Sequence, residues 1–450
     1  MGPNSGYDAV VVGAGPAGEH CAGALAKGGA RVAVVERERV GGECDYFACI
    51  PSKTLLRPGE ALARALDAPG AREAVTGAID PGAALAWRDF IVSGYDDSGE
   101  VAWLEQNHID LYRGSGKIAG PGSVEVDGRA LRTDNIVVAT GSNPFIPPIP
   151  GLRGLSGVWT NREATGLTEI PRRLLVLGGG PVGVETAQAL GRLGSSVAIV
   201  EGQEYLLPRE PRPLGEGLGD ALTAEGIELC LGQHAQSAAR DGEDCVLTLA
   251  DGREVRGDRL LAATGRRPRV HDIGLETVAV EVGPRGIVVD ERMAAGPGVW
   301  AIGDVTGIWP LTYVGKYQGR VAAANILGND MLANYAAVPR VVFTDPQAAS
   351  VGEEHGPLTT TVPLSTVPRA ATYARGYEDR PGFMTLVSDG TQLTGAFALG
   401  PEAGEWLQQA TLAIRAAVPL EILRDTIQPF PTFVEIFLYA MAQLGAPVRA

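Results

Sequence analysis

Two segments of the chain, residues 7–36 and 172–201, follow one plan, and this repeat constrains the fold more than any other feature. Each has a short apolar strand, a glycine-rich turn, an alanine-rich helical stretch and a second apolar strand that ends in glutamate. This order is that of a βαβ unit with a dinucleotide-binding turn. The repeat therefore predicts an α/β protein with two Rossmann-like domains, each suited to one dinucleotide.

The glycines of both turns have the spacing Gly-x-Gly-x-x-Gly. The first glycine makes the turn, the second lets a pyrophosphate approach the backbone, and the third packs the helix on the strand. This spacing alone is equally typical of an ordinary turn, but the flanking strand and helix and the acid further on favour a nucleotide site. The predicted binding residues are Gly13, Gly15, Gly18 and Glu36 in the first unit and Gly178, Gly180, Gly183 and Glu201 in the second.

The glutamate of each unit is placed to accept hydrogen bonds from a ribose. A carboxylate at Glu201 binds free ribose hydroxyls and repels a 2′-phosphate, which favours NAD over NADP, although Arg209 downstream weakens this preference. Two dinucleotides in one chain imply electron transfer between them.

The stretch "GGECDYFACIPSK", residues 41–53, places Cys44 and Cys49 five positions apart. In a regular α-helix five positions rise about 7.5 Å, which exceeds the Cα separation of about 4.4–6.8 Å in a disulfide. The two cysteines can therefore bridge only if Cys44 lies on an irregular turn or the helix is distorted between them. The alternative is a pair of buried, unpaired cysteines.

Composition narrows the class of partner. The chain has 450 residues, 45% of them hydrophobic, which predicts a globular protein of about three domains. A net charge of −15 argues against nucleic acid or an anionic membrane as partner. The first residues show no export signal and no run of 18 apolar residues occurs, so we expect a soluble, cytoplasmic protein.

Several motifs together resemble one known family. They are "GGECDYFACIPSK", the two glycine turns, "IVVATGS", "LLAATGRRP", "VWAIGDVTG" and "FTDPQAASVG", and they run in order from about residue 7 to 440. In this respect the chain is similar to the FAD-dependent pyridine nucleotide-disulfide oxidoreductases, which include dihydrolipoamide dehydrogenase, glutathione reductase and mercuric reductase.

The resemblance implies an FAD domain in two parts, 1–150 and 271–335, an inserted NAD domain, 151–270, and a C-terminal α+β dimerisation domain, 336–450. It also implies a homodimer in which Glu435 acts across the interface. The implied cofactors are FAD and NAD(H), with NADP less favoured.

The resemblance further assigns roles to single residues. Cys49 lies nearer the flavin, Cys44 is the thiol that exchanges with the substrate, and Lys53 pairs with Glu185 beside the cofactor. Asp304 holds the ribityl hydroxyls of FAD. The other residues that the resemblance places at the cofactors are Gly42, Gly116, Thr140, Gly141, Gly265 and Thr312.

The sequence departs from this family in its last domain. Most disulfide reductases of the family have His-Pro-Thr-x-x-Glu there, with the histidine as general acid/base. This chain reads "QPFPTFVE", so Phe430 replaces the imidazole while Glu435 is retained as a possible substitute base. The five histidines fit no pattern that would deliver one of them to Cys44. Since general acid–base assistance typically contributes about 10²- to 10⁴-fold, efficient dithiol exchange is in question.

These patterns predict an NADH-dependent flavoprotein that passes electrons through FAD to the Cys44/Cys49 disulfide and on to a small disulfide or other acceptor. One alternative is reduction of a quinone or soft metal ion, as in mercuric reductase, which also lacks the histidine. Against it, the residues "QLGAPVRA" contain no vicinal cysteines, and we expect no metal-binding front domain. Another alternative is a redox-sensing FAD/NAD module without turnover. We predict no resident metal.

Overall fold

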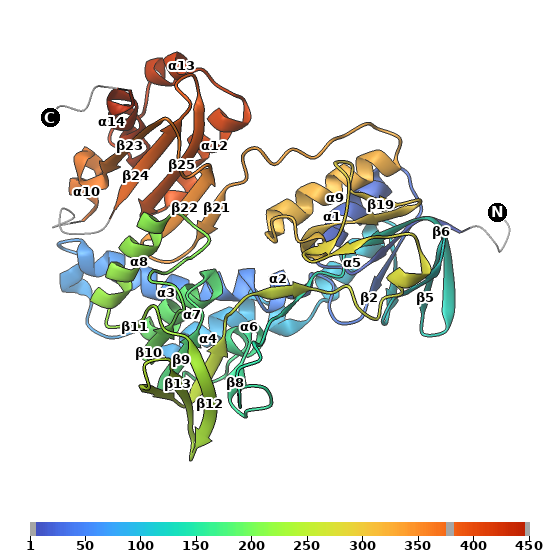
Figure 1. Ribbon diagram of the computed structural model, residues 1–450, viewed down its shortest axis with the longest axis horizontal. Coiled ribbons are helices and arrows are strands. Elements are labelled where there is room, and N and C mark those ends of the chain that lie inside the picture. Colours follow the sequence, from blue (N-terminus) through green and yellow to red (C-terminus); the bar gives the residue numbers. More distant parts are fainter. Residues whose placement is uncertain (1–5, 375–381, 446–450) are drawn as a thin grey trace. The chain divides into compact units, whose positions relative to one another are not determined.

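The structure, a computed structural model, describes residues 6–374 and 382–445. Its residues form two compact units, each built from three segments of the chain (Figure 1). Unit 1 comprises Met1–Pro51, Asp89–Phe145 and Arg266–Asn334. Unit 2 comprises Ser52–Arg88, Ile146–Gly265 and Tyr335–Ala450. Each glycine-rich turn predicted from the sequence thus has its own unit.

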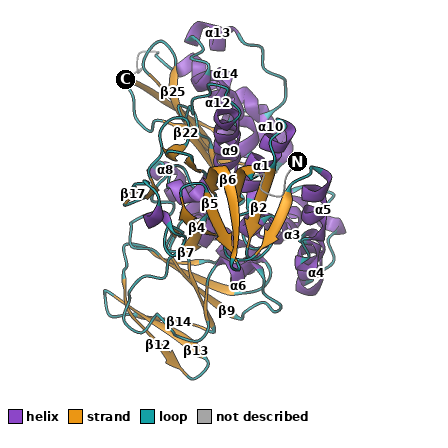
Figure 2. Ribbon diagram, turned by 90° about the vertical axis from the view of Figure 1, so that its right-hand side faces the viewer, coloured by secondary structure: helices purple, strands orange, loops and turns teal. Residues whose placement is uncertain are grey.

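The main sheet of unit 1 is a Rossmann-type sheet with the strand order β19-β20-β6-β1-β2-β3. From β20 to β3 its neighbours run parallel, while β4 and β5 extend it as an antiparallel hairpin from β6 (Figure 2). The apolar runs of the central strands are almost fully buried, as expected for parallel strands covered on both faces. The strands are β1 (Tyr7–Val12), β2 (Val32–Glu36), β3 (Asp110–Arg113), β4 (Lys117–Gly120), β5 (Ser123–Val126), β6 (Arg129–Val138), β19 (Ala294–Gly296) and β20 (Val299–Ala301).

Two helices of unit 1, α1 (Pro16–Lys27) and α9 (Thr312–Ile326), pack tightly against each other. Glycines permit this approach, because a Cβ on Gly319 would lie 2.7 Å from the carbonyl oxygen of Ala17 and one on Gly315 would lie 3.1 Å from the Ala17 Cβ. This packing fixes the start of α9, where Thr312 is the first helical residue. Unit 1 also contains α2 (Gly42–Tyr46), α5 (Ser98–Gln106), the 3₁₀ helix η4 (Gly303–Thr306) and the short strands β7 (Ser142–Pro144), β16 (Arg266–Pro268), β17 (Val282–Gly283) and β18 (Gly286–Ile287).

Unit 2 contains the second parallel sheet, with the order β11-β10-β9-β15-β8, and a separate antiparallel sheet β12-β13-β14. The parallel strands are β8 (Val158–Trp159), β9 (Arg173–Leu177), β10 (Ser196–Val200), β11 (Glu228–Cys230) and β15 (Arg259–Ala262). The antiparallel strands are β12 (Ala235–Asp241), β13 (Asp244–Leu249) and β14 (Glu254–Gly257). The helices that pack with them include α3 (Cys49–Asp67), α4 (Pro81–Ile91), α6 (Asn161–Thr165), α7 (Pro181–Arg192) and α8 (Arg212–Ala224); α3 begins in unit 1 and α4 ends there.

The last part of unit 2 is an antiparallel sheet of order β21-β22-β25-β24-β23 with helices packed on it. Its strands are β21 (Arg340–Val342), β22 (Gln347–Gly352), β23 (Leu358–Pro363), β24 (Phe383–Ser388) and β25 (Leu393–Gly400). Its helices are α10 (Pro368–Tyr373), α11 (Ala403–Trp406), α12 (Gln408–Arg415), α13 (Leu420–Asp425), the 3₁₀ helix η7 (Phe433–Glu435) and α14 (Ile436–Gln443). This is the mixed α+β arrangement predicted for the C-terminal region.

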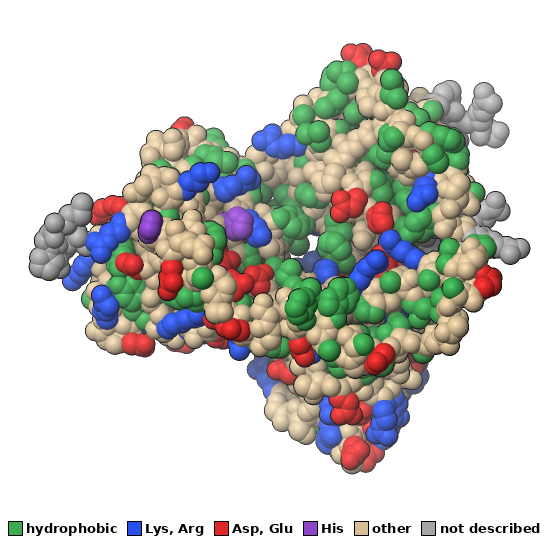
Figure 3. All heavy atoms as spheres, turned by 180° about the vertical axis from the view of Figure 1, so that it is seen from behind, with side chains coloured by type: hydrophobic (Ala, Val, Ile, Leu, Met, Phe, Trp, Pro, Cys, Tyr) green, Lys and Arg blue, Asp and Glu red, His purple; other side chains and the backbone are tan. Residues whose placement is uncertain are grey.

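No helix in the described part of the chain is both long enough and apolar enough to cross a membrane. On the described part of the face in Figure 3, acidic and basic side chains are interspersed and form no broad basic patch.

Arg88 of α4 is a charged residue inside unit 2 and is only 1% exposed. Its guanidinium donates hydrogen bonds to the carbonyl oxygens of Thr165 and Leu167, the latter at 2.7 Å. Without these two hydrogen bonds, the carbonyl oxygen of the last residue of α6 and that of Leu167 would lose a donor.

We expect Arg88→Met to lower the free energy of unfolding by about 2–4 kcal/mol, because it leaves these carbonyl oxygens buried and unpaired. Urea unfolding followed by far-UV circular dichroism measures the change. Arg209→Met, which removes the same charge from an exposed position, serves as the control. Equal stability of the two variants would contradict this role for Arg88.

Candidate active site

The two glycine-rich turns have nearly the same geometry. Gly13 and Gly178 have φ of +106° and +112°, and a Cβ on either would lie 2.4 or 2.5 Å from a backbone oxygen. A Cβ on Gly18 or Gly183 would lie 2.0 Å from the oxygen of the first glycine of its own turn. All four positions therefore require glycine, as the spacing predicted.

The middle glycines of these turns, Gly15 and Gly180, differ from the others because a Cβ there would meet open space. Each is the N-cap of the following helix, whose first backbone N–H groups have no partner within the helix itself. A pyrophosphate fits this arrangement, since it needs close access to the backbone and the positive end of a helix. The turns of this structure thus fit FAD and NAD.

The two strand-end glutamates are also equivalent. Glu36 accepts hydrogen bonds at 2.8 Å from the backbone of Ala14 and Glu38, and Glu201 accepts them at 2.7 and 2.9 Å from Gly179 and Gln203. Each carboxylate is thereby fixed beside its glycine turn, where the sequence predicts a ribose.

One of the other predicted cofactor-site residues, Asp304, belongs to a hydrogen-bond network in unit 1. Asp304 of η4 accepts a hydrogen bond from Ser142 at 2.6 Å, and Arg266 donates to the same serine hydroxyl at 2.7 Å and to Glu43 at 3.1 Å. The remaining predicted positions are Thr140, which donates to the carbonyl of Arg269, Gly141 with φ +71°, Gly265 with φ +117° in unit 2, and Gly116, whose Cβ would press on Val12 and Val35.

Cys44 and Cys49 lie on two separate helices. α2 ends at Tyr46, its C-cap Phe47 has φ −133°, and α3 begins at Cys49. This break is the irregularity that the spacing of the cysteines requires. Upstream, Gly42 has φ +60°, and a Cβ there would lie 2.8 Å from the Cα of Gly15. The first cysteine is therefore anchored next to the first glycine turn.

One hydroxyl joins the two thiols. The Oγ1 of Thr312 lies 3.2 Å from the Sγ of Cys49 and donates to the Sγ of Cys44 at 3.4 Å. Both cysteines are in the thiol form and half-buried. The hydrogen bond with Cys49, together with burial, raises the pKa of Cys44 far above its ordinary value. The sequence placed Thr312 at the cofactor through its backbone and gave no sign of this hydroxyl.

Three carboxylates of unit 1 lie close to one another, and one of them, Asp45 of α2, is next to Cys44; the other two are Glu19 of α1 and Glu100 of α5. The Asp45 carboxylate lies within hydrogen-bonding reach of the Cys44 thiol, and Glu100 accepts a hydrogen bond from Tyr46 at 3.0 Å. Burial, with added repulsion from Asp45 and Glu100, raises the pKa of Glu19 to about 8. Burial and the charge of Glu100 also raise the pKa of Asp45.

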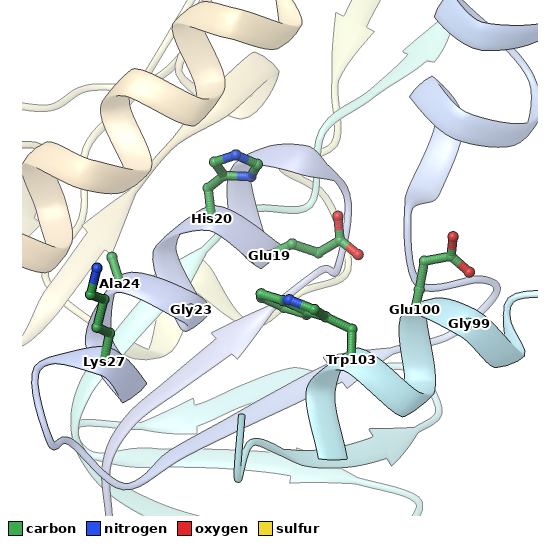
Figure 4. A pocket seen from close by; sticks show the side chains of 8 residues that line it. All are labelled: Glu19, His20, Gly23, Ala24, Lys27, Gly99, Glu100 and Trp103. Carbon is green, nitrogen blue, oxygen red and sulfur yellow. The ribbon is translucent and has the colours of Figure 1, made fainter. Parts of the chain in front are cut away.

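A cavity of about 610 Å³ reaches this carboxylate cluster. Figure 4 shows Glu19 of α1 pointing toward Glu100 and Trp103 of α5, while the His20 ring points away from them. The lining residues are Glu19, His20, Gly23, Ala24, Lys27, Gly99, Glu100 and Trp103. Sequence analysis missed this cluster. The signal for it was an acid directly after Gly18 and another directly after Cys44.

Lys53 and Glu185 form an ion pair in unit 2. The Nζ of Lys53 donates to Glu185 at 2.6 Å and lies 4.8 Å from the ring centre of Phe343, whose backbone N–H donates to the same carboxylate at 2.9 Å. Glu185 is only 5% exposed. The predicted pair is present, and it satisfies a buried carboxylate that would otherwise be costly.

Phe430, where the resemblance leads us to expect a histidine, is 71% exposed and carries no titratable group. Glu435 is 7% exposed, and its Oε2 is buried with no hydrogen-bond partner among the described residues. An unpaired buried oxygen of this kind calls for a donor.

The five cysteines include Cys21, Cys230 and Cys245, which are buried, as is typical of structural cysteines.

The pKa of Glu19 in the folded protein is about 8, above its ordinary value of 4.5, so the folded protein binds this proton more tightly than the unfolded chain does. The free energy of unfolding is therefore highest at low pH, where Glu19 is protonated, and falls as pH rises toward 8. Glu19→Gln should therefore match the wild type near pH 4 and be more stable at pH 8.5, by about 2–3 kcal/mol after allowance for partial exposure. Urea unfolding midpoints at the two pH values test this. Glu105→Gln, at an exposed glutamate of α5, is the control. If the stability of both variants depended on pH in the same way, the raised pKa of Glu19 would be refuted.

Comparison with known proteins agrees with this geometry. Residues 7–319 match the family described as pyridine nucleotide-disulphide oxidoreductase, and residues 338–441 match its dimerisation domain. A dihydrolipoyl dehydrogenase of Thermus scotoductus is 36% identical over 97% of each chain. A mercuric reductase of Acidithiobacillus ferrooxidans is 37% identical over 94% of this chain and 80% of that protein.

A solved structure has the same fold. The Cu(II) complex of the HOCl-induced flavoprotein disulfide reductase RclA from Escherichia coli superposes with a TM-score of 0.85 at 27% identity, covering 97% of this chain and 99% of that one. The α/β architecture and the pairing with FAD and NAD(H) follow from these matches and from the glycine turns. The chain belongs to the FAD-dependent pyridine nucleotide-disulphide oxidoreductases.

Proposed function

We propose that this enzyme takes electrons from NADH and delivers them, through FAD and the Cys44/Cys49 pair, to a small acceptor at Cys44. The observation that carries the proposal is the Thr312 hydroxyl, which contacts both sulfur atoms. Two thiols held against one donor are placed to form and open a disulfide without large movement. When bound, FAD supplies the two-electron transfer between NADH and this pair.

The chain's own residues supply binding and orientation. The first turn, with Gly13, Gly15 and Gly18, and the carboxylates of Glu36 and Asp304 would hold FAD. The second turn, with Gly178, Gly180, Gly183 and Glu201, would hold NAD, and Glu201 favours NAD over NADP by repelling a 2′-phosphate. Further cofactor contacts are proposed for Gly42, Lys53, Gly116, Thr140, Gly141, Gly265 and Thr312.

Lys53 and Glu185 would serve the cofactor as a fixed charge pair. The carboxylate of Glu185 is held by the backbone of Phe343, so it keeps the Lys53 ammonium in one place. A positive charge fixed in this way stabilises negative charge on a group bound beside it.

The match to the dimerisation domain supports a homodimer. In such a dimer Glu435, whose Oε2 has no partner in the described chain, would find its donor in the partner subunit. Phe430 offers no proton there, so exchange at Cys44 must differ from that of relatives with an imidazole.

A second candidate acceptor is a soft metal ion. Two findings favour it: the 37% identity to a mercuric reductase and the likeness to a flavoprotein disulfide reductase solved as a Cu(II) complex. In the described part of the chain no group of three or more His, Cys, Asp or Glu side chains could hold a resident metal ion.

Steady-state NADH oxidation by the FAD-loaded protein tests the proposal with lipoamide, glutathione disulfide, small quinones and Cu(II) as acceptors. We expect Cys44→Ser and Cys49→Ser to lower kcat/KM for the physiological class of acceptor by at least about 10²-fold, since a nucleophilic thiolate is lost. Cys230→Ala, at a buried cysteine of unit 2, is the control. Full turnover of every acceptor by Cys44→Ser would contradict the proposal.

A further inference from the structure

The reduced site has a thiol that must lose a proton before it can react. Only a thiolate attacks a disulfide, and the hydrogen bond with Cys49 and burial keep Cys44 protonated. The side chain at position 430 is a phenyl group. A proton acceptor for Cys44 must therefore come from elsewhere in the structure.

We propose that Asp45 takes the proton from Cys44 and returns it, and that Glu19 and Glu100 link Asp45 to solvent at the cavity between α1 and α5. The inference rests on the proposed function in one respect, the assignment of Cys44 as the exchanging thiol. It adds a proton acceptor to that assignment.

Position is the first argument for Asp45. It follows Cys44 directly in the short helix α2, and its carboxylate lies within hydrogen-bonding reach of the Cys44 thiol. Two features fix the position of α2. The chain turns into it through Gly41 and Gly42, which have left-handed backbone with φ of +100° and +60°. At its other end Tyr46 is buried and donates a hydrogen bond to Glu100. The acceptor is thus fixed beside the atom that it deprotonates.

The charges around Asp45 are the second argument. Burial, and after it the negative charge of Glu100 on α5, raises the pKa of Asp45, while Lys316 of α9 and the hydrogen bond with Cys44 act in the opposite direction. A carboxyl group with a raised pKa is a stronger base than an ordinary aspartate, and it is a better match for a thiol. Glu19, with a pKa of about 8, is itself able to hold or release a proton near neutral pH.

The cavity gives the third argument. It brings solvent to Glu19 and Glu100, so a proton that reaches Asp45 can leave the site without passing the thiols (Figure 4). A general acid/base must return to its starting protonation state after each turnover. A carboxyl group in a site closed to solvent could not exchange its proton for this purpose.

The exchange step balances with these groups alone. The Asp45 carboxylate accepts the proton of the Cys44 thiol as its sulfur attacks an acceptor disulfide. One acceptor sulfur bonds to Cys44 and the other leaves as a thiolate, which takes the proton from Asp45. Cys49 then loses its own thiol proton and attacks the Cys44 sulfur, which forms the Cys44–Cys49 disulfide. The second half of the acceptor leaves as a thiolate and takes up one proton, equal to the one that Cys49 gave up. The acceptor gains two electrons and the cysteine pair loses two.

Two other side chains compete for this role. His20 lines the same cavity, but its ring points away from Glu19, and its pKa is lowered by burial and by Lys316. Glu435 lies in unit 2 and would act only from a partner subunit. The experiment includes a variant of each.

The test follows the reaction of Cys44 itself. The FAD-loaded protein is reduced with one equivalent of NADH and mixed anaerobically with 4,4′-dithiodipyridine, an uncharged disulfide whose product absorbs in the near ultraviolet. At pH 7 we expect Asp45→Ala and Asp45→Asn to slow this exchange by about 10²-fold, with the deficit shrinking as pH rises because hydroxide can then take the proton. Acetate at 0.1 M, compared with equal chloride, should restore part of the rate in Asp45→Ala only.

A merely electrostatic or structural role gives a different result. Removing the negative charge of Asp45 lowers the pKa of Cys44, so without proton transfer the variants should react as fast as the wild type or faster. Such rates, or a loss of rate in His20→Gln or Glu435→Gln with none in Asp45→Asn, would overturn the proposal. Glu105→Gln is the matched control on α5, and FAD content per chain verifies folding of each variant.

The same assay separates this inference from the proposed function. Unchanged exchange in Cys44→Ser would disprove the role of Cys44, on which both depend. Lost exchange in Cys44→Ser with normal exchange in both Asp45 variants would disprove the role of Asp45 alone.

Discussion

The contact of both cysteine sulfurs with the hydroxyl of Thr312 is the interaction on which the active site depends. It requires the break between α2 and α3, since a continuous helix would separate Cys44 from Cys49 by more than a disulfide spans. It also requires the close packing of α9 on α1, which the glycines of α9 allow and which fixes the threonine. The sulfur chemistry is thus tied to the same helix that begins at the first nucleotide turn.

The proposed exchange at Cys44 needs a proton acceptor, and the phenyl group of Phe430 cannot be one. In unit 1 the carboxylate of Asp45 lies next to Cys44; burial and the charge of Glu100 raise its pKa, and burial with the charges of Asp45 and Glu100 raises the pKa of Glu19. A group of this kind belongs to the same unit as the thiol it serves, so its action needs no partner subunit.

The sequence was sufficient wherever a local pattern demands one geometry. The glycines at 13 and 178, the strand-end glutamates and the Lys53–Glu185 pair all occupy the predicted places, because close backbone contact or a buried charge leaves few alternatives. It failed where elements distant in the chain meet. Nothing in the local pattern indicates that Glu100 of α5 lies near Asp45 of α2, or that the Thr312 side chain would reach the sulfurs.

The central claim is that Cys44 and Cys49 form a redox pair coupled to the flavin. An anaerobic reductive titration of the FAD-loaded protein, followed by flavin absorbance and by thiol counting, tests it most directly. The account predicts uptake of four electrons per chain, two by FAD and two by the cysteine pair, and only two in Cys44→Ser. Uptake of two electrons by the wild type, with no new thiols, would contradict it.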